Sequence, residues 1–517
     1  MPRRVPRRQV RAAASVPSPA SGAVALWLLA ALAVPRVIRI LYPAVWVEDD
    51  VLLQCALAVA KGLRPYLDFA HAQMPLLEWV AGLYIHLVGA STVRMEILNA
   101  VAIYAASLLV FFVGRRAVGS RAATAASLLY AWHSLVFRYH VWAREFFVSA
   151  LVLGAVLVLL DQTRPSWRHI TGAATLLFAA CAIKLTAIVS TTALLLFVAA
   201  GQRSPRRAAI VAAVFACEFG AFVSGCWWRY GDSFFFQAFL FHFLKGVDTG
   251  AGPAYLASLL DVLGPLALLG VWHLQRTRCW NHALGIVTAV LGAYLLFFCV
   301  LSPTAWGHNF VEVWPFIAIL GGAGVVWFID AWPGSPLRLG AGVAVVAICL
   351  IWVTPLDNDS NLRGSRYGFG FVARRELDEL ATALNRGTAP SEEVIAPSFI
   401  AFEADRLQAI RYPENYGVMT AADEVRRSAG FWTARAQFGG KSFFELIDQT
   451  SDIWNREVVR DLAPGGRVNA MIPDSPIQLL PLVNASPAAL AERGFHPALQ
   501  SEHFVLWLRH GDTSIAR

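Results

Sequence analysis

The stretch that decides the fold is EDDVLLQCALAVAKGLRPYLDFAHAQMPL, residues 48 to 76. It begins with three consecutive carboxylates, Glu48, Asp49 and Asp50, just after the first long apolar segment at 22–42. A run of about 20 apolar residues is long enough to span a bilayer as a helix. Three carboxylates at the mouth of a membrane helix indicate chemistry at that point of the chain.

Composition assigns the chain to the multi-pass membrane proteins. Hydrophobic residues make up 57% of its 517 residues and charged residues 15%, whereas an ordinary soluble domain has about 25% charged residues. Helices are the open-ended structure that satisfies its own backbone hydrogen bonds inside lipid. We therefore expect a polytopic α-helical membrane protein with about eleven transmembrane helices, near 22–42, 94–113, 121–137, 145–161, 169–184, 186–201, 207–229, 255–275, 281–301, 309–330 and 337–355.

Positively charged loops predict the orientation, because short loops rich in lysine and arginine stay on the cytoplasmic side. Arginines precede the first span and recur at every second connection: Arg3, Arg4, Arg7, Arg8, Arg11, Arg115, Arg116, Arg121, Arg164, Arg168, Arg203, Arg206, Arg207, Arg276 and Arg278. The alternation requires the short apolar run 76–90 to lie along the outer interface. We expect a plasma-membrane protein with a cytoplasmic N-terminus, an outer loop at 43–93 and an extracytoplasmic C-terminus.

Composition also divides the chain into a disordered basic arm at 1–21, a transmembrane domain at 22–356 and a tail at 357–517. The tail, about 160 residues, is long enough for one compact domain. Charged and apolar residues have helical spacing from Arg374 to Leu384. Three short apolar runs read as strands: Val394–Ala396, Val468–Ile472 and Phe504–Leu508. The tail is therefore predicted to form a C-terminal extracytoplasmic α/β domain.

The formal net charge of +8 raises the question of nucleic-acid binding. Most of the excess arginine lies in the cytoplasmic loops and the N-terminal arm, where topology and anionic lipid account for it. Nucleic acid is therefore not an expected partner. The seven cysteines are scattered without CxxC or Cys/His ligand spacing, so no structural zinc site is predicted.

Two hypotheses account for the acidic triplet. Neighbouring like charges raise the pKa of one group, which makes Asp49 or Asp50 a better proton acceptor near neutral pH and a candidate general base. Alternatively, Glu48 to Asp50 mark a solvated helix end, since carboxylates stabilise the N-terminus of a helix through its dipole. Composition alone favours the second hypothesis, and the residues that follow favour the first.

The string that follows, Lys61 to Leu76, reads KGLRPYLDFAHAQMPL. An acidic pair in the first outer loop, followed by Asp68, then His71 and Pro75–Leu76, resembles the protein O-mannosyltransferase branch of the GT-C glycosyltransferases. The pattern G-x-x-P-Y-x-D-F, which begins at Gly62, is similar to that of the many bacterial relatives of this branch. The resemblance covers 40–200 well and weakens towards residue 355.

This resemblance implies a GT-C-like helical bundle that uses a polyprenyl-phosphate sugar donor. Asp49 maps onto the base of the family and Asp50 onto its acidic partner, while Asp68 and His71 belong with the substrate-binding residues. The usual Asp-Glu pair is Asp-Asp here, and the paired prolines after the histidine are replaced by Gln-Met-Pro. The choice of base among Glu48, Asp49 and Asp50 therefore stays open.

The helix after the second outer loop begins with Arg144 and Glu145, at the place where the family carries a second acid. Glu145 is expected to orient the acceptor. Arg138 or Arg144 is expected to bind the donor phosphate, because arginine contacts phosphate oxygens bidentately. The alternative is that these side chains only snorkel to the membrane interface.

Three further residues are candidates for contact with the donor phosphate. Lys184 is the only charge in an apolar stretch of roughly thirty residues, so it must reach an interface or a polar cavity. It is expected near the outer turn of a helical hairpin, where snorkelling is the alternative. Lys245 lies in the aromatic-rich loop 230–254, which is also typical of an ordinary interfacial belt. His308 is expected to stabilise the leaving phosphate or to be structural.

The sequence thus predicts an inverting membrane glycosyltransferase. Asp49 takes the proton of an acceptor hydroxyl, the hydroxyl attacks the anomeric carbon of a polyprenyl-phosphate hexose or pentose, and the lipid phosphate leaves. The expected partners are this donor, a glycan, lipid or protein acceptor and membrane lipids. Relatives differ in whether they need a divalent metal, and no compact ligand set is visible, so the cofactor is unassigned.

Two other classes fit parts of the sequence. A transporter or flippase of lipid-linked saccharides would use the acidic loop to guide substrate without making a bond. Such proteins often contain inverted repeats and helices broken at the bilayer midplane, and neither is clear in this sequence. The third class is a non-catalytic envelope assembly protein. Loss of the acidic residues would indicate this class, but the acidic residues are present.

Overall fold

The computed structural model describes side chains at 52–134, 142–160, 166–200, 204–239, 271–276, 280–301, 311–330, 373–409, 456–473 and 486–509, and at some positions of 251–270. The backbone alone is described for several short stretches, among them 44–51 and 368–371. The predicted arm at 1–21, the polar linker that follows residue 356 and most of the predicted spans 22–42 and 337–355 lie outside the described residues.

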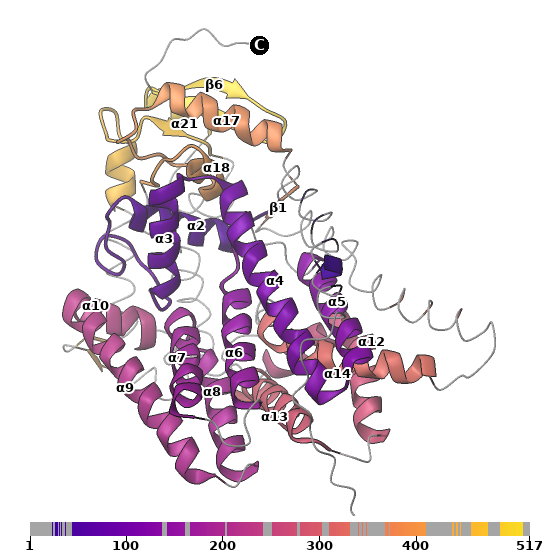
Figure 1. The fold of residues 1–517 in the computed structure, drawn as a ribbon. Helices are drawn as coiled ribbons and strands as arrows, with labels where there is room; N and C mark the ends of the chain where they lie inside the picture. The colour runs from indigo at the N-terminus through magenta and orange to yellow at the C-terminus, as the bar shows by residue number, and fades with distance from the viewer. Residues whose placement is uncertain are drawn as a thin grey trace, which may run out of the picture.

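Helices form the body of the molecule, and the elements of the C-terminal region lie together at one end of it (Figure 1). The helices of the body are α4 (Thr92–Ala117), α5 (Ser120–Val136), α6 (Arg144–Leu160), α7 (Trp167–Ile183), α8 (Ala187–Leu196), α9 (Pro205–Tyr230), α12 (Ala251–Arg276), α13 (His282–Leu296) and α14 (Phe310–Asp330). Short π-helical segments, η1 (Phe197–Gly201) and η3 (Phe297–Leu301), extend α8 and α13.

The end of the body that faces the C-terminal region carries two shorter helices. These are α2 (Val47–Ala60) and α3 (Leu76–Val88), which pack against each other. The segment α10 (Asp232–Phe235) and the π-helical η2 (Phe236–Leu240) follow α9. The region predicted as one outer loop, 43–93, therefore contains two helices. They are joined by residues 61–75, which we call the signature stretch.

The core of the body is built around α14, which packs against both α5 and α12. Glycines allow this close approach, because a Cβ at Gly322 would lie 2.6 Å from the backbone nitrogen of Ala126. A Cβ at Gly324 would lie even closer to the carbonyl oxygen of Leu269. Small residues at such positions are typical of helices that pack inside a membrane.

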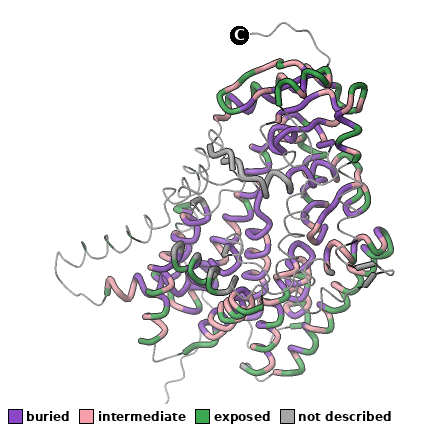
Figure 2. Tube along the Cα trace, turned by 180° about the vertical axis from the view of Figure 1, so that it is seen from behind, coloured by how far each residue is buried: buried purple, intermediate pink, exposed green. Residues whose placement is uncertain are grey.

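Figure 2 shows that the helices of the body have buried residues on the sides turned inward and exposed residues on the sides turned outward. Many exposed residues are large and hydrophobic, among them Val101, Trp228 and Leu268. Four of the described helices are long and apolar enough to cross a membrane, judged by length and composition: Thr92–Ala117, Pro205–Tyr230, His282–Leu301 and Val311–Asp330. Large exposed apolar surfaces indicate contact with lipid or protein. The predicted number of transmembrane helices stays a prediction.

The described part of the C-terminal region contains helices and a three-stranded antiparallel sheet. The strands are β5 (Ala470–Met471), β6 (His496–Gln500) and β7 (Val505–Leu508), in the order β5-β7-β6. The helices are α17 (Arg374–Gly387), α18 (Ser398–Glu403) and α21 (Pro487–Glu492). Leu377, Leu380 and Leu384 lie on one face of α17 and are buried against the sheet, as the helical spacing from Arg374 to Leu384 predicts.

Two of the predicted strands overlap with β5 and β7. In the third, Ile395 forms an isolated bridge to Met471 of β5, and Val394 forms one to Gln408. A further hairpin joins β3 (Gln437–Phe438) to β4 (Lys441–Ser442).

The C-terminal region contacts the N-terminal part of the chain at several points. The strand β1 (Ala44–Trp46), which precedes α2, pairs antiparallel with β2 (Gly368–Phe371). The buried Gln54 amide of α2 donates to the carbonyl oxygens of Ser398 at 3.0 Å and Arg406 at 3.3 Å. At the start of α4, the backbone nitrogen of Thr92 donates to Glu403 Oε2 at 2.7 Å. The C-terminal region thus fixes α2 and α4 through specific polar contacts.

Candidate functional site

The acidic triplet lies in the first turn of α2, directly after β1. The first turn of a helix favours carboxylates through the helix dipole, so this backbone position is compatible with both hypotheses drawn from the sequence. The side chains of Glu48, Asp49 and Asp50 lie outside the described residues.

The signature stretch after α2 forms a tight loop. Gly62 ends the helix with a φ of 85°, a conformation that glycine adopts without strain. Tyr66 also has a positive φ, 68°, and its hydroxyl donates to the carbonyl oxygen of Gln73 at 2.5 Å. Asp68, predicted to bind substrate, accepts from the backbone nitrogen of Arg64 at 2.8 Å and from its Nε at 3.0 Å. Asp68 therefore stabilises this loop.

One glutamine joins the signature stretch, which we also call the signature loop, to the π-helical segment η2 that follows α9. Gln237, in η2, donates through Nε2 to the carbonyl oxygen of Tyr66 at 3.1 Å and accepts through Oε1 from the backbone nitrogen of His71 at 2.9 Å. The Tyr66 ring also packs on Tyr230 and Phe234. The position of His71 is therefore set by contacts far from it in the sequence.

His71 is fully buried and faces a carboxylate on α3. Its Nε2 lies 3.3 Å from Oε2 of Glu78, in the first turn of that helix. A guanidinium nitrogen of Arg144, the first residue of α6, lies 3.9 Å from the other oxygen of Glu78. Two predicted substrate-binding residues are thus brought together by an acid that the sequence analysis did not single out.

Two other predicted residues, Glu145 and Lys184, are in direct contact, although the sequence did not predict that they pair. Lys184 follows the last turn of α7, and its Nζ lies 2.8 Å from Glu145 Oε1 and 2.8 Å from Glu312 Oε1. Thr186 Oγ1 donates to the same Glu312 carboxylate at 2.8 and 2.9 Å. Lys184 therefore lies at the turn between α7 and α8 and is held between two carboxylates. The predicted position of this turn on the outer face stays a prediction.

These two groups adjoin at the start of α6, because Arg144 and Glu145 are consecutive. We call the six residues His71, Glu78, Arg144, Glu145, Lys184 and Glu312 the ion-pair network. All six are buried, and they come from the signature loop and from the ends of α3, α6, α7 and α14. Burying charge is costly even when it is paired, so charged groups inside a membrane protein are by default candidates for function.

Sequence reasoning missed Glu78 and Glu312. Each is the only acid within a strongly apolar run, LLEWVAGLYIHLV for Glu78 and FVEVWPFIAIL for Glu312. A single charge in such a run is the same signal that singled out Lys184. The signal was therefore present, but the partner of each acid depends on which helix ends meet.

Three predicted residues, Arg138, Lys245 and His308, lie outside the described residues. Their roles stay predictions. The described residues also offer one group with the chemistry of a metal site, Glu376, Glu502 and His503, whose ligand atoms lie within 4.8 Å of one another.

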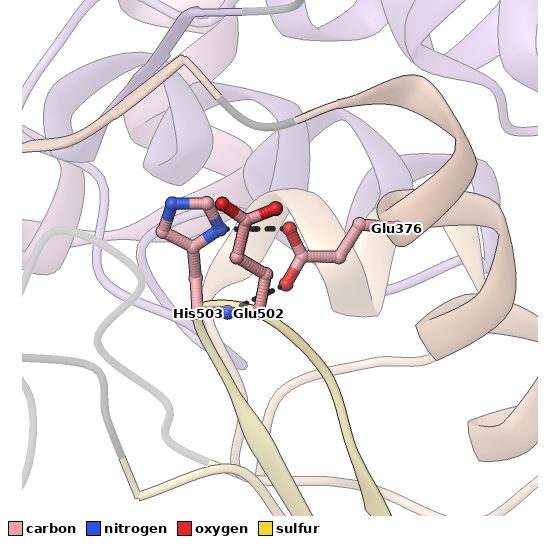
Figure 3. A group of neighbouring side chains, drawn as sticks. All are labelled: Glu376, Glu502 and His503. Carbon is pink, nitrogen blue, oxygen red and sulfur yellow. Dashed lines mark hydrogen bonds and ion pairs between the residues drawn. The ribbon is translucent and has the colours of Figure 1, made fainter.

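Figure 3 shows how this group is arranged at the turn between β6 and β7. Glu376 accepts from the backbone nitrogen of His503 at 2.8 Å and from Ser501 Oγ at 2.5 Å, and it contacts the His503 ring. Burial raises the pKa of Glu376, but these hydrogen bonds outweigh it and the pKa is lowered overall. Because both oxygens of Glu376 already accept hydrogen bonds, the group joins α17 to the hairpin rather than forming a vacant ligand set.

Comparison with known proteins gives matches in structure alone. No protein-family model matches the chain, and no curated protein matches it in sequence. The structure of ArnT from Cupriavidus metallidurans bound to undecaprenyl phosphate aligns with a TM-score of 0.61, at 12% identity, over 96% of this chain and 98% of that chain. Both ArnT and the archaeal oligosaccharyltransferase described next are GT-C glycosyltransferases. This chain has the GT-C fold.

Two more structures agree. ArnT from the same organism in the apo state gives a TM-score of 0.59 at 15% identity, over 96% of this chain and 99% of that chain. The apo oligosaccharyltransferase of Archaeoglobus fulgidus gives 0.50 at 12% identity, over 88% of this chain and 69% of that chain. The resemblance inferred from the signature stretch is therefore confirmed at the level of the GT-C fold, in a mostly helical, multi-pass membrane protein.

Proposed function

We propose that this chain is an inverting membrane glycosyltransferase that moves a sugar from a polyprenyl-phosphate donor to an acceptor hydroxyl on the extracytoplasmic side. The observation that carries the proposal is the GT-C fold, shared along 96% of the chain with an ArnT that was solved bound to undecaprenyl phosphate. The ion-pair network supports it, since buried charge at the ends of several helices is typical of a site that handles a charged substrate.

In the proposed reaction, Asp49 is the general base, with Asp50 and Glu48 as the alternatives. Asp49 takes the proton of the acceptor hydroxyl while the hydroxyl oxygen attacks the anomeric carbon from the side opposite the phosphate. The bond between the anomeric carbon and the phosphate oxygen breaks, and the phosphate leaves with the bonding electrons. General-base catalysis of this kind contributes typically about 10²- to 10⁴-fold.

The leaving phosphate requires cations. Arg144 is the proposed phosphate ligand among the described residues, with Arg138, Lys245 and His308 as further candidates, because charge-assisted hydrogen bonds to phosphate are the strong ones. Lys184 already pairs with two carboxylates, which favours a different role. We assign Lys184 to holding Glu145 in place, so that Glu145 can orient the acceptor.

The same proposal assigns the topology. The arginine-rich loops and the N-terminus are cytoplasmic, and α2, α3 and the region 357–517 are extracytoplasmic. In this arrangement 357–517 is a separate domain above the membrane whose proposed role is to bind the acceptor, which is a glycan, a lipid or a protein.

The test is transfer of label from a radiolabelled polyprenyl-phosphate sugar, with mannose as the first sugar tried, to acceptors in a membrane extract. Purified wild type is expected to transfer label. Asp49→Asn is expected to reduce transfer by about 10²-fold or more at an unchanged thermal unfolding midpoint. Asp50→Asn and Glu48→Gln decide which carboxylate is the base, because the base is the residue whose loss has the largest effect on kcat.

The same experiment separates an enzyme from a transporter. Movement of the labelled lipid across a vesicle membrane without any transfer would favour the flippase and would contradict the proposal. Full transfer in all three acidic variants would also contradict it, because no carboxylate of the triplet would then act as the base.

A further inference from the structure

A pocket of about 420 Å³ lies between α2, α3 and the end of α9, apart from the ion-pair network. Its inner part is apolar. The helices α2 and α3 touch at Gly82, where a Cβ would lie 2.6 Å from Val59 Cγ1, and the rings of Trp79 and Tyr230 face each other with centroids 6.5 Å apart. The volume falls within the range of small-molecule sites.

The mouth of this pocket carries positive charge. The guanidinium of Arg229 lies 5.6 Å from the centre of the Tyr230 ring, and His86 lines the same opening. The ion pairs formed among the described side chains do not include Arg229. The nearest acid in the sequence, Asp232, accepts instead from Trp227 Nε1 at 3.1 Å. Arg229 is thus a cation available to a ligand at the edge of an apolar cavity.

The surroundings are those of a membrane interface. Arg229 lies at the end of α9, one of the helices long enough to cross a membrane. Trp228 beside it is 92% exposed, and on the α3 side of the pocket Leu83 is 60% and Leu87 72% exposed. Tryptophan and arginine at the end of a membrane helix lie at the level of the lipid headgroups. The pocket therefore opens where lipid headgroups meet their chains.

We propose that this pocket binds an anionic phospholipid. Arg229 contacts the phosphate, since a guanidinium pairs with phosphate oxygens bidentately, and the first carbons of one chain lie against Trp79 and Leu83, which line the pocket. Arg229 has no carboxylate partner among the described side chains, so its positive charge at the mouth of the pocket favours a lipid with net negative charge over a zwitterionic one. The site goes beyond the proposed glycosyl transfer and takes no part in it.

The experiment is native mass spectrometry of the purified full-length protein with phosphatidylglycerol or phosphatidylcholine added at equal concentrations. Wild type is expected to retain phosphatidylglycerol preferentially. Arg229→Gln is expected to lose about tenfold in affinity, which is the loss of one charge-assisted contact, and Arg229→Lys is expected to recover part of it. Arg276→Gln is the matched control, because Arg276 also ends a helix and lies over an aromatic ring, Trp327, at 5.9 Å.

Several outcomes would overturn the proposal. Equal retention of the two lipids, or equal losses in Arg229→Gln and Arg276→Gln, would show that the pocket does not select anionic lipid. Competition by inorganic phosphate alone would assign the site to a soluble anion. Displacement by polyprenyl phosphate at stoichiometric concentration, together with lost sugar transfer in Arg229→Gln, would make the pocket part of the donor site. If wild type showed no glycosyl transfer, the proposed function would be contradicted, but the lipid-binding proposal would not be affected.

Discussion

At the scale of single residues, the ion-pair network explains why isolated charges occur in the apolar helices of this chain. Lys184 was recognisable from the sequence, because a lone charge in an apolar run must have a partner or reach an interface. Glu78 and Glu312 carried the same signal. Glu145 was singled out by the resemblance, at the place of the family's second acid. What the sequence did not contain is the pairing itself, since Lys184 meets Glu312 only because the end of α7 and the start of α14 lie together.

Lys184→Met is expected to destabilise the protein by about 3 kcal/mol, because it leaves Glu145 and Glu312 buried without their cation. The measurement is thermal or denaturant unfolding of the purified protein in detergent. Arg121→Met is the matched control, since the Arg121–Asp330 pair at 3.1 Å is exposed and exposed pairs contribute about 0–1 kcal/mol.

A triple variant, Glu145→Gln, Lys184→Met and Glu312→Gln, is expected to recover much of the loss, because it removes the uncompensated charges together. If Lys184→Met unfolds at the same temperature as wild type, the ion pairs of Lys184 do not contribute the expected free energy to the stability of the protein.

The Glu376 carboxyl gives a pH-dependent contribution to stability. Burial raises its pKa, but the hydrogen bonds from Ser501 and His503 outweigh burial and lower the pKa from its ordinary value of 4.5. A carboxyl with a lowered folded-state pKa stabilises the protein at pH values above 4.5 and loses this contribution as the pH falls towards the folded-state pKa. The unfolding midpoint of wild type should therefore exceed that of Glu376→Gln at neutral pH, and the gap should narrow below 4.5.

The control for this pH series is Glu379→Gln, on the same helix, whose ion pair with Arg375 is exposed. The difference in unfolding midpoint between wild type and Glu379→Gln is expected to be small at every pH. If the difference in unfolding midpoint between wild type and Glu376→Gln stayed constant down to about pH 3, the lowered pKa of Glu376 would be contradicted.

At the scale of elements, hydrophobic periodicity predicted a helix correctly where one face of the helix is buried and the other is in water. The helix α17 was recognised in this way, because apolar residues recur at Leu377, Leu380 and Leu384. The helix α2 was not recognised within the outer loop, since residues 52–58 are all buried and give no clear amphipathic pattern. Short strands such as β5, of two residues, are set by their neighbours in the sheet more than by their own sequence.

The packing of α14 gives a test at this scale. Gly322→Ala would place a methyl group 2.6 Å from the Ala126 nitrogen and 2.8 Å from the Ala122 carbonyl oxygen. These are backbone atoms of α5 that cannot rotate away, so a cost of about 1–3 kcal/mol is expected.

Gly172→Ala in α7 is the matched control, since a Cβ there meets nothing within 4 Å. It should be neutral or stabilise by up to about 1 kcal/mol, because alanine is the better helix former. Unfolding of both variants in detergent gives the comparison. Equal midpoints for the two variants would mean that α14 and α5 are not packed this closely.

At the scale of the whole molecule, the resemblance carried by residues 48–76 was enough to predict the GT-C fold. The contacts between the C-terminal region and α2 were not predicted. Several outer segments were expected on the same face, and their charges and lengths do not encode which of them pack together. Gln54, within an apolar run of α2, gave no hint that Ser398 and Arg406 would accept its hydrogen bonds.

These contacts matter because α2 begins with the acidic triplet and is held at both ends by the C-terminal region. The strand pair β1–β2 fixes the chain before its first turn. Lys61, just after its last turn, donates to the Asp405 carbonyl oxygen at 3.0 Å and lies 3.1 Å from the Asp405 carboxylate. Between them lies the buried amide of Gln54.

Gln54→Leu removes the two buried hydrogen bonds from the Gln54 amide to the carbonyl oxygens of Ser398 and Arg406, at a cost of about 1–3 kcal/mol. Backbone amides of α2 are therefore expected to exchange with deuterium faster, while those of α14 stay protected. Arg121→Met is the control, because the exposed Arg121–Asp330 pair joins α5 to α14 and its loss should leave exchange in α2 unchanged. Under the proposed function, Gln54→Leu lowers kcat with little change in KM, since a mobile α2 misplaces the base without removing it. Unaltered exchange in α2 would show that the C-terminal region rests on this helix without positioning it.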